Sequence, residues 1–470
     1  EAEGTVELSF TFDASALQGK TLVAFESVSY QEKEVAVHTD IESEPQSIYF
    51  PEIGTKATCP ETESQTAPPK KELTITDTVS YRLIPGKEYK LTGTLMDKET
   101  GEPLLVDGKP ITAEKTFTPK EAEGTEELSF TFDASALAGK TIVVFESVFY
   151  EDKEIAIHAD IESVPQSIYF SEIGTKASCP ETGSKTAPAK KELTITDTVS
   201  YHLVPGQEYK LTGTLMDKET GEPLLVDGKP VTSEKTFTPK EAEGMEELTF
   251  TFDASALRGK TIVAFESVSY QEKEVAVHAD INSPEQSIYF PEIGTTAKDG
   301  KDGDQEALAE KETKLIDTVA FKGLTAGDYR LVGTLMDKET GKEVLVNGKP
   351  VTSETTFRPE TAEGILDVPF TFDATGLKGH DLVVFEKLYV TVKADKGEKD
   401  VEVTSHEDIT AESQTVKLIE EPEKPKTPPV ETPDVPQTGD TTNLWIPIVV
   451  LLVALAGIVA VAVRIYRKRM

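Results

Sequence analysis

The chain has 470 residues and carries 48 Lys and Arg against 84 Asp and Glu, which gives a net charge of −36. This length accommodates several domains of ordinary size. The acidity excludes nucleic acid and other acidic polymers as expected partners, and we expect the charge to belong to a solvated surface.

The sequence repeats itself along the chain. The segment "EAEGTVELSFTFDASALQGKT" begins at residue 1 and returns, slightly altered, at 121 and 241, with a more distant copy at 361, a period of 120 residues. This period far exceeds a solenoid repeat, so each repeat is expected to be a domain. Residues 1–49 then hold the C-terminal part of a truncated repeat, and complete repeats follow at 50–169, 170–289 and, diverged, 290–418. No signal peptide precedes residue 1, so we expect a fragment that lacks its N-terminal part.

Within a repeat, apolar and polar residues alternate as they do in half-buried β-strands. Leu128, Phe130 and Phe132 show this period in "ELSFTFDAS", and "YKLTGTLMDKETGEPLLV" predicts two strands joined by a turn at "KETGE". No stretch shows sustained helical periodicity. We therefore predict an all-β protein of tandem antiparallel Ig-like β-sandwich domains. Thr175 follows Gln166 by only nine positions, which favours a semi-rigid rod.

Two cysteines, Cys59 and Cys179, occupy equivalent positions in the first two complete repeats, and the third has Asp299 there. One cysteine per repeat cannot form a disulfide within a domain, and two are too few for a disulfide framework. We therefore expect free surface thiols without a metal or redox role. We also expect no cofactor.

A glutamate, a histidine and a glutamine stand at equivalent places in all four copies. Recent duplication explains this in the first three copies, which are nearly identical. The fourth copy replaces most of the surrounding sequence and still keeps the three residues, with an aspartate two positions after the histidine. The four trios are Glu26, His38 and Gln46; Glu146, His158 and Gln166; Glu266, His278 and Gln286; and Glu386, His406 and Gln414.

The spacing between glutamate and histidine fits a β-hairpin. Glu146 and His158 are symmetric about residue 152, in the turn "YEDKE", so a hairpin there places them opposite each other. In the fourth copy the separation grows by eight residues and the midpoint becomes 396, which predicts four more residues in each arm. A surface contact is a simple alternative for any single copy. The retention of the glutamate and the histidine in the diverged copy favours a functional pair.

The N-terminal half of each complete repeat adds a threonine and an aspartate. The threonine lies in "EIGTKA" or "EIGTTA", where Lys56 and Lys176 occupy the position of Thr296, so the register selects Thr295. The aspartate follows twenty-two residues later, in "TITDTVSY" or "KLIDTVAF". The pairs are Thr55 and Asp77, Thr175 and Asp197, and Thr295 and Asp317.

These five residue types, in this order, accompany a strand that is written "LVAFE", "IVVFE", "IVAFE" or "LVVFE". The combination resembles the VaFE-type Thr–Gln ester-bond domains of Gram-positive surface proteins, over nearly the whole chain. The resemblance implies an autocatalytic ester between the threonine hydroxyl and the glutamine carboxamide, with loss of ammonia, in a protein that is otherwise not an enzyme. The implied pairs are Thr55–Gln166, Thr175–Gln286 and Thr295–Gln414, and the implied orphan half-site is Glu26, His38 and Gln46.

For this chemistry the threonine hydroxyl needs a base. His278, held by Asp197 as in a Ser–His–Asp arrangement, is the expected base. Glu266 lies on an apolar strand, so we expect a raised pKa and donation of a hydrogen bond or proton to the amide. The division of roles between aspartate and glutamate stays open. By register the same roles fall to Asp77, Glu146 and His158, and to Asp317, Glu386 and His406. A bond closing about 110 residues would add roughly 4–5 kcal/mol of stability.

The C-terminus has three successive features. A Pro-rich acidic stretch at 419–434 predicts an extended wall-spanning linker. "VPQTG" occupies 435–439, and the uncharged apolar run at 444–463 with the basic tail at 464–470 predicts one transmembrane helix and a cytoplasmic tail. This order resembles the LPxTG sorting signal of Gram-positive bacteria, with Val435 in place of leucine. It implies that sortase cleaves between Thr438 and Gly439 and joins Thr438 to peptidoglycan; a plain membrane anchor is the alternative.

Together these features predict the wall-anchored stalk of an adhesin on the surface of a Gram-positive bacterium, whose missing N-terminal region contacts a host ligand. Alternatively, the repeats themselves bind a host ligand such as an extracellular matrix protein. A hydrolase using glutamate and histidine is disfavoured by the multiple copies and the partner glutamine. A Lys–Asn isopeptide bond is disfavoured because Asn282 and Asn347 have no asparagine counterparts in the copy of the repeat that begins at residue 121.

Overall fold

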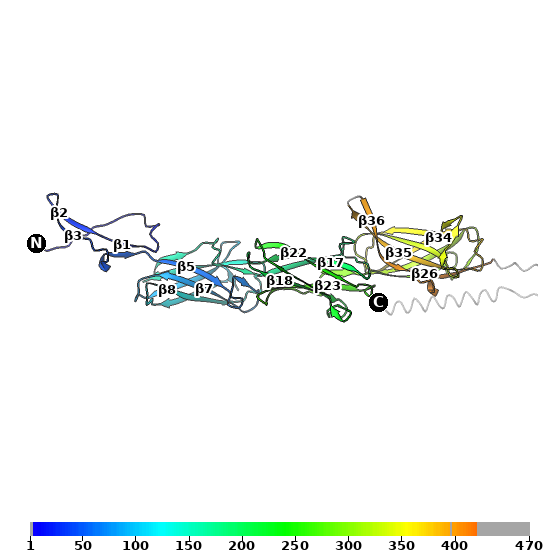
Figure 1. Ribbon diagram of the computed structural model, residues 1–470, viewed down its shortest axis with the longest axis horizontal. Coiled ribbons are helices and arrows are strands. Elements are labelled where there is room, and N and C mark those ends of the chain that lie inside the picture. The colour runs from blue at the N-terminus through cyan, green and yellow to red at the C-terminus, as the bar shows by residue number, and fades with distance from the viewer. Residues whose placement is uncertain (1–2, 395–396, 421–470) are drawn as a thin grey trace, which may run out of the picture. The chain divides into compact units, whose positions relative to one another are not determined.

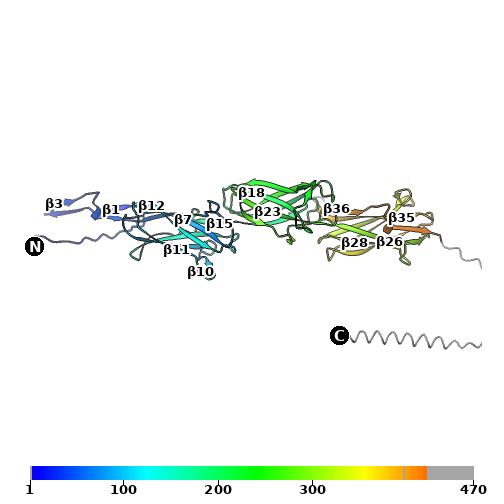
Figure 2. The same cartoon turned by 90° about the horizontal axis from the view of Figure 1, so that it is seen from below.

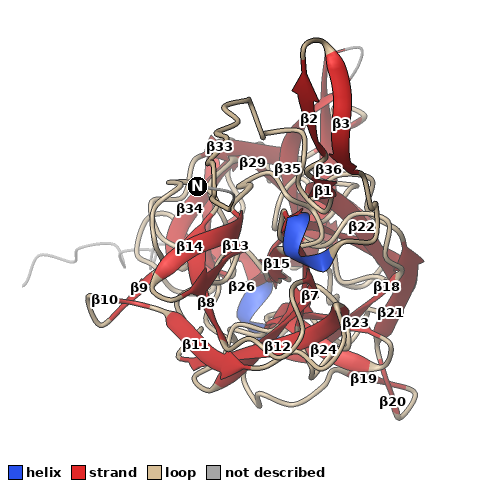
Figure 3. Cartoon of the chain, turned by 90° about the vertical axis from the view of Figure 1, so that its left-hand side faces the viewer, coloured by secondary structure: helices blue, strands red, loops and turns tan. Residues whose placement is uncertain are grey.

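The computed structural model describes residues 3–394 and 397–420, which form four tandem β domains (Figure 1). The prediction of an all-β protein is confirmed. Within these described residues the helical structure consists of two single-turn 3-10 helices, η1 (Glu44–Gln46) and η2 (Glu412–Gln414) (Figure 3). No helix in this part of the chain is long and apolar enough to cross a membrane. The sorting motif, the apolar run and the basic tail lie outside the described residues, as does the linker beyond Glu420.

The first complete domain contains two main sheets and a separate pair, β9 with β10. One main sheet has the strand order β12-β7-β5, and the other has the order β11-β8-β13-β15-β6 with β14 also on β13. Figure 2 labels β7, β11, β12 and β15 of this domain. The strands are β5 (Glu52–Thr58), β6 (Thr66–Ala67), β7 (Leu73–Arg82), β8 (Tyr89–Asp97), β9 (Leu105–Val106), β10 (Lys109–Pro110), β11 (Thr112–Phe117), β12 (Glu123–Phe132), β13 (Thr141–Tyr150), β14 (Lys153–His158) and β15 (Ser167–Phe170).

The second complete domain repeats this arrangement, with sheets ordered β16-β17-β22 and β21-β18-β23-β24, and with β25 also on β23. Its strands are β16 (Glu172–Ser178), β17 (Leu193–His202), β18 (Tyr209–Asp217), β19 (Leu225–Val226), β20 (Lys229–Pro230), β21 (Thr232–Phe237), β22 (Glu243–Phe252), β23 (Thr261–Tyr270), β24 (Lys273–His278) and β25 (Ser287–Tyr289).

The third complete domain has sheets ordered β26-β28-β34 and β27-β37-β35-β29-β30, with β33 on β29 and β36 on β35. Its strands are β26 (Glu292–Asp299), β27 (Glu306–Leu308), β28 (Thr313–Lys322), β29 (Asp328–Asp337), β30 (Lys342–Glu343), β31 (Leu345–Val346), β32 (Lys349–Pro350), β33 (Thr352–Phe357), β34 (Gly364–Phe372), β35 (Asp381–Ala394), β36 (Gly397–His406) and β37 (Thr415–Ile419).

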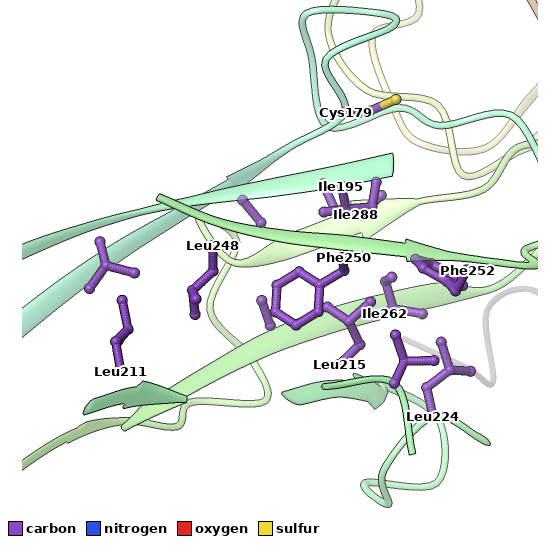
Figure 4. Close-up of a cluster of buried hydrophobic side chains, with 14 of the residues drawn as sticks. Cys179, Ile195, Leu211, Leu215, Leu224, Leu248, Phe250, Phe252, Ile262 and Ile288 are labelled. Atoms are coloured by element: carbon purple, nitrogen blue, oxygen red, sulfur yellow. The ribbon is translucent and has the colours of Figure 1, made fainter. Parts of the chain in front are cut away.

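The core of each complete domain lies between its two sheets, because alternate residues of every long strand point inward. In the second domain, Leu248 and Phe250 of β22 point toward Leu215 of the facing sheet, and all three are at most 1% exposed (Figure 4). Fully burying one such side chain contributes about 1.5–3 kcal/mol. In "ELSFTFDAS" of the first complete domain, the equivalent residues Leu128, Phe130 and Phe132 are 2%, 2% and 7% exposed, so the period-2 pattern predicted the core face correctly.

One strand pairing departs from the predicted antiparallel sheets. The last strand of the first domain, β15, pairs parallel with β6 and antiparallel with β13, and in the third domain β37 pairs parallel with β27. A parallel pair needs a long connection, and about 100 residues separate β6 from β15. The pairing brings the end of the domain beside its beginning. Local sequence patterns carry no signal for it.

The cysteines are free, as predicted, but the prediction that they lie on the surface is wrong. Cys59 and Cys179 are both 0% exposed and belong to the hydrophobic cores. Each pairs with a serine five residues later through a β-bridge. The inward period of β5, which includes Thr55 and Ala57, continues to Cys59, so alternation favoured burial over exposure.

The predicted hairpins are confirmed in all four copies, where Glu26, Glu146, Glu266 and Glu386 stand directly opposite His38, His158, His278 and His406. The turn in the first complete domain consists of Glu151 and Asp152, both with positive φ, which fits a tight two-residue turn. Such a turn is centred half a residue before 152. A β-bulge between Val148 and Phe149 shifts the register by one residue, and this shift places Glu146 opposite His158. The predicted pairing is therefore correct, but it depends on a bulge that the spacing did not reveal.

The diverged domain lengthens its hairpin as predicted. The strand β13 has 10 residues and β14 has 6, whereas β35 has 14 and β36 has 10. Four residues are therefore added to each arm. The glutamate and the histidine keep their register because equal additions preserve the pairing.

Residues 3–50 form only part of such a domain. β1 (Thr21–Val23) pairs with β4 (Ser47–Tyr49), and β2 (Glu26–Tyr30) pairs with β3 (Lys33–His38). Apolar side chains that would face a second sheet are exposed here, among them Phe10 at 65% and Val35 at 60%. The residues that correspond to Phe10 in the complete domains, Phe130, Phe250 and Phe370, are at most 2% exposed.

The burial of the thiols predicts slow labelling. In the folded chain we expect Cys59 and Cys179 to resist alkylation by iodoacetamide, because a buried thiol has no access to the reagent. Addition of denaturant at the same pH should make both react. Intact-mass spectrometry counts the labels; rapid labelling of the folded chain would contradict the buried positions.

Candidate functional site

The threonine and the aspartate come from neighbouring strands of the smaller sheet. Thr55 lies on β5 and is 9% exposed, and Ala57, two residues further along the same face, pairs with Asp77 of β7. Asp77 is 0% exposed and continues an inward row that is otherwise apolar, between Ile75 and Val79. The alternation of β7 therefore forces a carboxyl group into the core.

The glutamate and the histidine come from the larger sheet. Glu146 is 1% exposed on β13, in an inward row between Val144 and Val148, and it pairs with Gly93 of β8 on one side and with His158 on the other. The facing sheets thus each contribute one buried carboxyl group. Equivalent strands position Asp197 with Glu266 and Asp317 with Glu386.

The glutamine lies in the loop just before the last strand. Its side chain is 0% exposed in each complete domain. Gln166 Nε2 donates to Glu146 Oε2 at 2.6 Å and to the Val144 carbonyl oxygen at 2.5 Å. Gln286 Nε2 donates to Glu266 Oε2 at 2.7 Å, and Gln414 Nε2 donates to the Val384 carbonyl oxygen at 2.6 Å. The amide nitrogen therefore faces the glutamate in the first two domains.

The threonine hydroxyl lies at the same place. In the first complete domain, Thr55 Oγ1 is 3.3 Å from His158 Nδ1. In the other two, Thr175 Oγ1 and Thr295 Oγ1 are buried without a hydrogen-bond partner among the described residues, and so are the Nδ1 atoms of His278 and His406. The structure brings all five predicted residue types of each complete domain together, although they are spread over more than a hundred residues of chain.

The two carboxyl groups strongly affect each other's pKa. Burial raises the pKa of Glu146 to about 10, and the nearby negative charge of Asp77 adds to the rise. Burial also raises the pKa of Asp77 to about 6, while a hydrogen bond from Glu146 opposes the rise. At neutral pH the pair therefore holds one proton, mostly on the glutamate. The same directions and causes apply to Glu266 with Asp197 and to Glu386 with Asp317.

This arrangement corrects one predicted role. We expected Asp197 to hold His278, but neither carboxylate oxygen of Asp197 has a hydrogen-bond partner among the described residues, and the carboxyl group that acts on its pKa is that of Glu266. The reason is geometric: the aspartate projects from the smaller sheet toward the glutamate on the facing sheet. The prediction of a raised glutamate pKa is confirmed.

A glycine that sequence reasoning missed makes room for the site. A Cβ atom on Gly93 or Gly213 would lie 2.6–2.8 Å from the side chains of an inward phenylalanine and leucine of the facing sheet. On Gly333 it would lie 2.5 Å from Glu386 Oε1 and 2.6 Å from Phe370 Cζ. Each glycine pairs with the buried glutamate, in "LTGTL" or "LVGTL". A glycine at a fixed place within a strand was the available signal.

The orphan half-site keeps part of this geometry. Gln46 Nε2 donates a hydrogen bond to Glu26, as in the first two complete domains, and Glu26 pairs with His38. Among the described residues, this copy has neither the threonine strand nor the aspartate strand. It therefore has an amide and an acid without a nucleophile.

Each complete domain is thus a β domain with a buried threonine, two carboxyl groups, a histidine and a glutamine at one place. The family model of the T-Q ester bond containing domain matches residues 1–50, 51–170, 171–290 and 291–418. The chain belongs to this family.

Several solved structures show similarity at low identity. A bacterial adhesin from Mobiluncus mulieris containing intramolecular disulfide, isopeptide and ester bond cross-links is 19% identical, with a TM-score of 0.23 over 53% of this chain and 88% of that one. The C-terminal domain of the Streptococcus pyogenes antigen I/II-family protein AspA is 8% identical, with a TM-score of 0.25 over 53% of this chain and 99% of that one. No curated protein matches the chain.

The carboxyl pair predicts how stability depends on pH. In a chain carrying Thr55→Ala, Thr175→Ala and Thr295→Ala, no ester can form and the pair remains. The unfolded glutamate loses its proton near the ordinary glutamate pKa of 4.5, whereas the folded pKa of Glu146 is about 10. Between these values the folded state binds more protons, so its stability falls as pH rises. The midpoint of thermal unfolding should fall across this range.

The matched control also carries Glu146→Gln, Glu266→Gln and Glu386→Gln. It keeps a neutral group beside each aspartate and removes the titration of the three glutamates. Its midpoint should therefore change less over the same pH range, by differential scanning calorimetry. Parallel pH profiles in the two chains would contradict the proton-sharing pair.

The glycine predicts a steric effect. Gly333→Ala should destabilise the third complete domain by about 1–3 kcal/mol, because the added methyl group overpacks Glu386 and Phe370. Gly294→Ala, in the same domain and with nothing within 4 Å of its Cβ, is the control and should cost far less. Thermal unfolding of both variants compares them. Equal losses would mean that Gly333 has no special spatial role.

Proposed function

We propose that each complete repeat forms an ester between its threonine and its glutamine, and that the chain is the cross-linked stalk of a cell-surface protein. The observation that carries the ester is the burial of Thr55, Glu146 and Gln166 at one place, repeated in both other complete domains. Membership of the T-Q ester bond family supports it. The bonds would join Thr55 to Gln166, Thr175 to Gln286 and Thr295 to Gln414.

The geometry suggests how the reaction proceeds. Thr55 Oγ1 attacks the Cδ atom of Gln166, and its proton passes to His158, whose Nδ1 lies 3.3 Å away. Protonated Glu146 gives its proton to the amide nitrogen that it already contacts, and ammonia leaves. The proton on His158 then restores Glu146, which stands opposite it in the hairpin. Asp77 keeps Glu146 protonated until Glu146 gives its proton to the amide nitrogen.

The proposed bond also changes the mechanics of the domain. In the first complete domain the chain enters on β5 and leaves on β15, and these strands belong to different sheets. Three residue pairs join β15 to β13. Without a cross-link, tension acts on this short ladder. An ester between Thr55 and Gln166 transmits tension from the first strand to the last directly. The chain-entropy model adds roughly 4–5 kcal/mol of stability for such a loop.

Short connections suit a stalk. One residue, Ser171, separates β15 from β16, and two residues separate β25 from β26. Such links leave little freedom between neighbouring domains, which supports a semi-rigid rod of Ig-like sandwiches. The sequence features at 435–470 suggest that sortase joins Thr438 to peptidoglycan in a Gram-positive cell wall.

The ester predicts a mass change. The chain should be lighter than its sequence by three ammonia molecules, one for each complete domain, because each bond releases one. The variant with Thr55→Ala, Thr175→Ala and Thr295→Ala should show no deficit. Intact-mass spectrometry measures this. No deficit in either chain would exclude cross-linking and favour ligand-binding repeats, and a deficit that survives in the variant would indicate Lys–Asn isopeptide bonds.

A further inference from the structure

A residue ten positions after the reactive threonine contacts the glutamine loop in every complete domain. It is Gln65 in the first, Lys185 in the second and Gln305 in the third. The five-residue site does not include it. Its side chain crosses from the segment that follows the threonine strand to the loop that carries the reacting glutamine.

The side-chain nitrogen donates to backbone carbonyl groups on that loop. Gln65 Nε2 donates to the carbonyl oxygen of Val164 and, at 2.7 Å, to that of Ser167. Lys185 Nζ donates to the Pro284 carbonyl oxygen at 2.6 Å. The carbonyl groups of Val164 and Pro284 each belong to the residue two positions before the reacting glutamine.

The third domain makes the same contact with different loop residues. Gln305 Nε2 donates to the carbonyl oxygens of Glu412 at 2.8 Å, Ser413 at 3.2 Å and Thr415 at 3.0 Å. Glu412 is again two positions before the glutamine, here Gln414. The contact therefore persists where the loop sequence has changed from "SVPQS" or "SPEQS" to "AESQT".

The backbone carbonyl group of the same residue accepts a hydrogen bond from the strand that follows the glutamine. The carbonyl oxygens of Gln65, Lys185 and Gln305 accept from the N–H groups of Tyr169, Tyr289 and Lys417, at 2.9, 2.8 and 2.8 Å. The threonine strand also holds the loop, because the N–H groups of Ala57 and Ala177 donate to the carbonyl oxygens of Pro165 and Glu285, at 3.0 and 3.1 Å. Residues on both sides of the glutamine are thereby fixed to the segment that carries the threonine.

We propose that Gln65, Lys185 and Gln305 are positioning residues for ester formation, which hold the glutamine carboxamide against the threonine hydroxyl through backbone hydrogen bonds. This inference rests on the proposed cross-link. Glutamine and lysine share a flexible stem that ends in an N–H donor, and lysine has no acceptor. The donor is therefore the property that the position requires, whether or not it carries charge.

These hydrogen bonds from the positioning residue to the glutamine loop affect the rate of ester formation for a geometric reason. The attacking oxygen and the carbonyl carbon react only from a near-attack arrangement, and a misplacement of about 1 Å costs on the order of a hundredfold in rate. The glutamine lies in a loop, whereas the threonine lies on a strand. Fixing the loop backbone to the threonine segment removes the freedom that would separate them.

The test follows cross-linking of the full chain after cell-free synthesis. Samples quenched at successive times are digested, and mass spectrometry measures the fraction of the Thr55 peptide joined to the Gln166 peptide. The second and third domains of the same chain serve as internal clocks. The variants are Gln65→Leu, which removes the donor, and Gln65→Lys, which restores it; Lys185→Leu and Lys185→Gln repeat the comparison in the second domain. Protease protection of each domain reports folding in the same samples.

We expect Gln65→Leu to slow its own ester at least about tenfold relative to the internal clocks, in a protease-protected domain, and Gln65→Lys to restore the rate. Lys185→Leu and Lys185→Gln should behave likewise. An unchanged rate in the leucine variants would overturn the inference, and so would equal slowing in the lysine and leucine variants. A leucine variant that fails to become protected would show a folding role instead. Absence of cross-links in the unsubstituted domains would contradict the proposed function itself.

Discussion

Two carboxyl groups facing each other between the sheets of each complete domain are the constraint on which the rest of the site depends. Burying Asp77 and Glu146 at 0% and 1% exposure would be costly for two charges, and a shared proton removes one of them. The pair also fixes how the sheets meet, because each carboxyl group projects from a different one. The glutamine amide and the threonine hydroxyl lie beside this carboxyl pair.

Local patterns predicted much of this site. The symmetry of glutamate and histidine about a turn predicted their pairing, because antiparallel register follows from spacing alone. The retention of Glu386, His406 and Gln414 in a diverged copy identified them as more than products of duplication. Alternation predicted the inward faces of the long strands. These features depend on residues close in sequence.

The features that sequence did not predict depend on contacts between distant segments. The aspartate lies close to a glutamate on the other sheet, about 70 residues away, and the spacing of the motifs carries no signal for this proximity. The space provided by Gly93 and the parallel pairing of β15 with β6 are equally non-local. The sequence did not reveal the positioning residue because its type changes from Gln65 to Lys185, although the N–H donor is retained.

The one-residue connection between β15 and β16 has a consequence for extensibility. With the proposed esters, the backbone outside the closed loops consists of the eight residues between Gln166 and Thr175. A domain without its ester could unravel and release the 110 residues between Thr55 and Gln166, roughly 370 Å of extended chain. A linked domain can release none of it. The chain would then keep a nearly constant contour length under tension, so the distance between its two ends would change little.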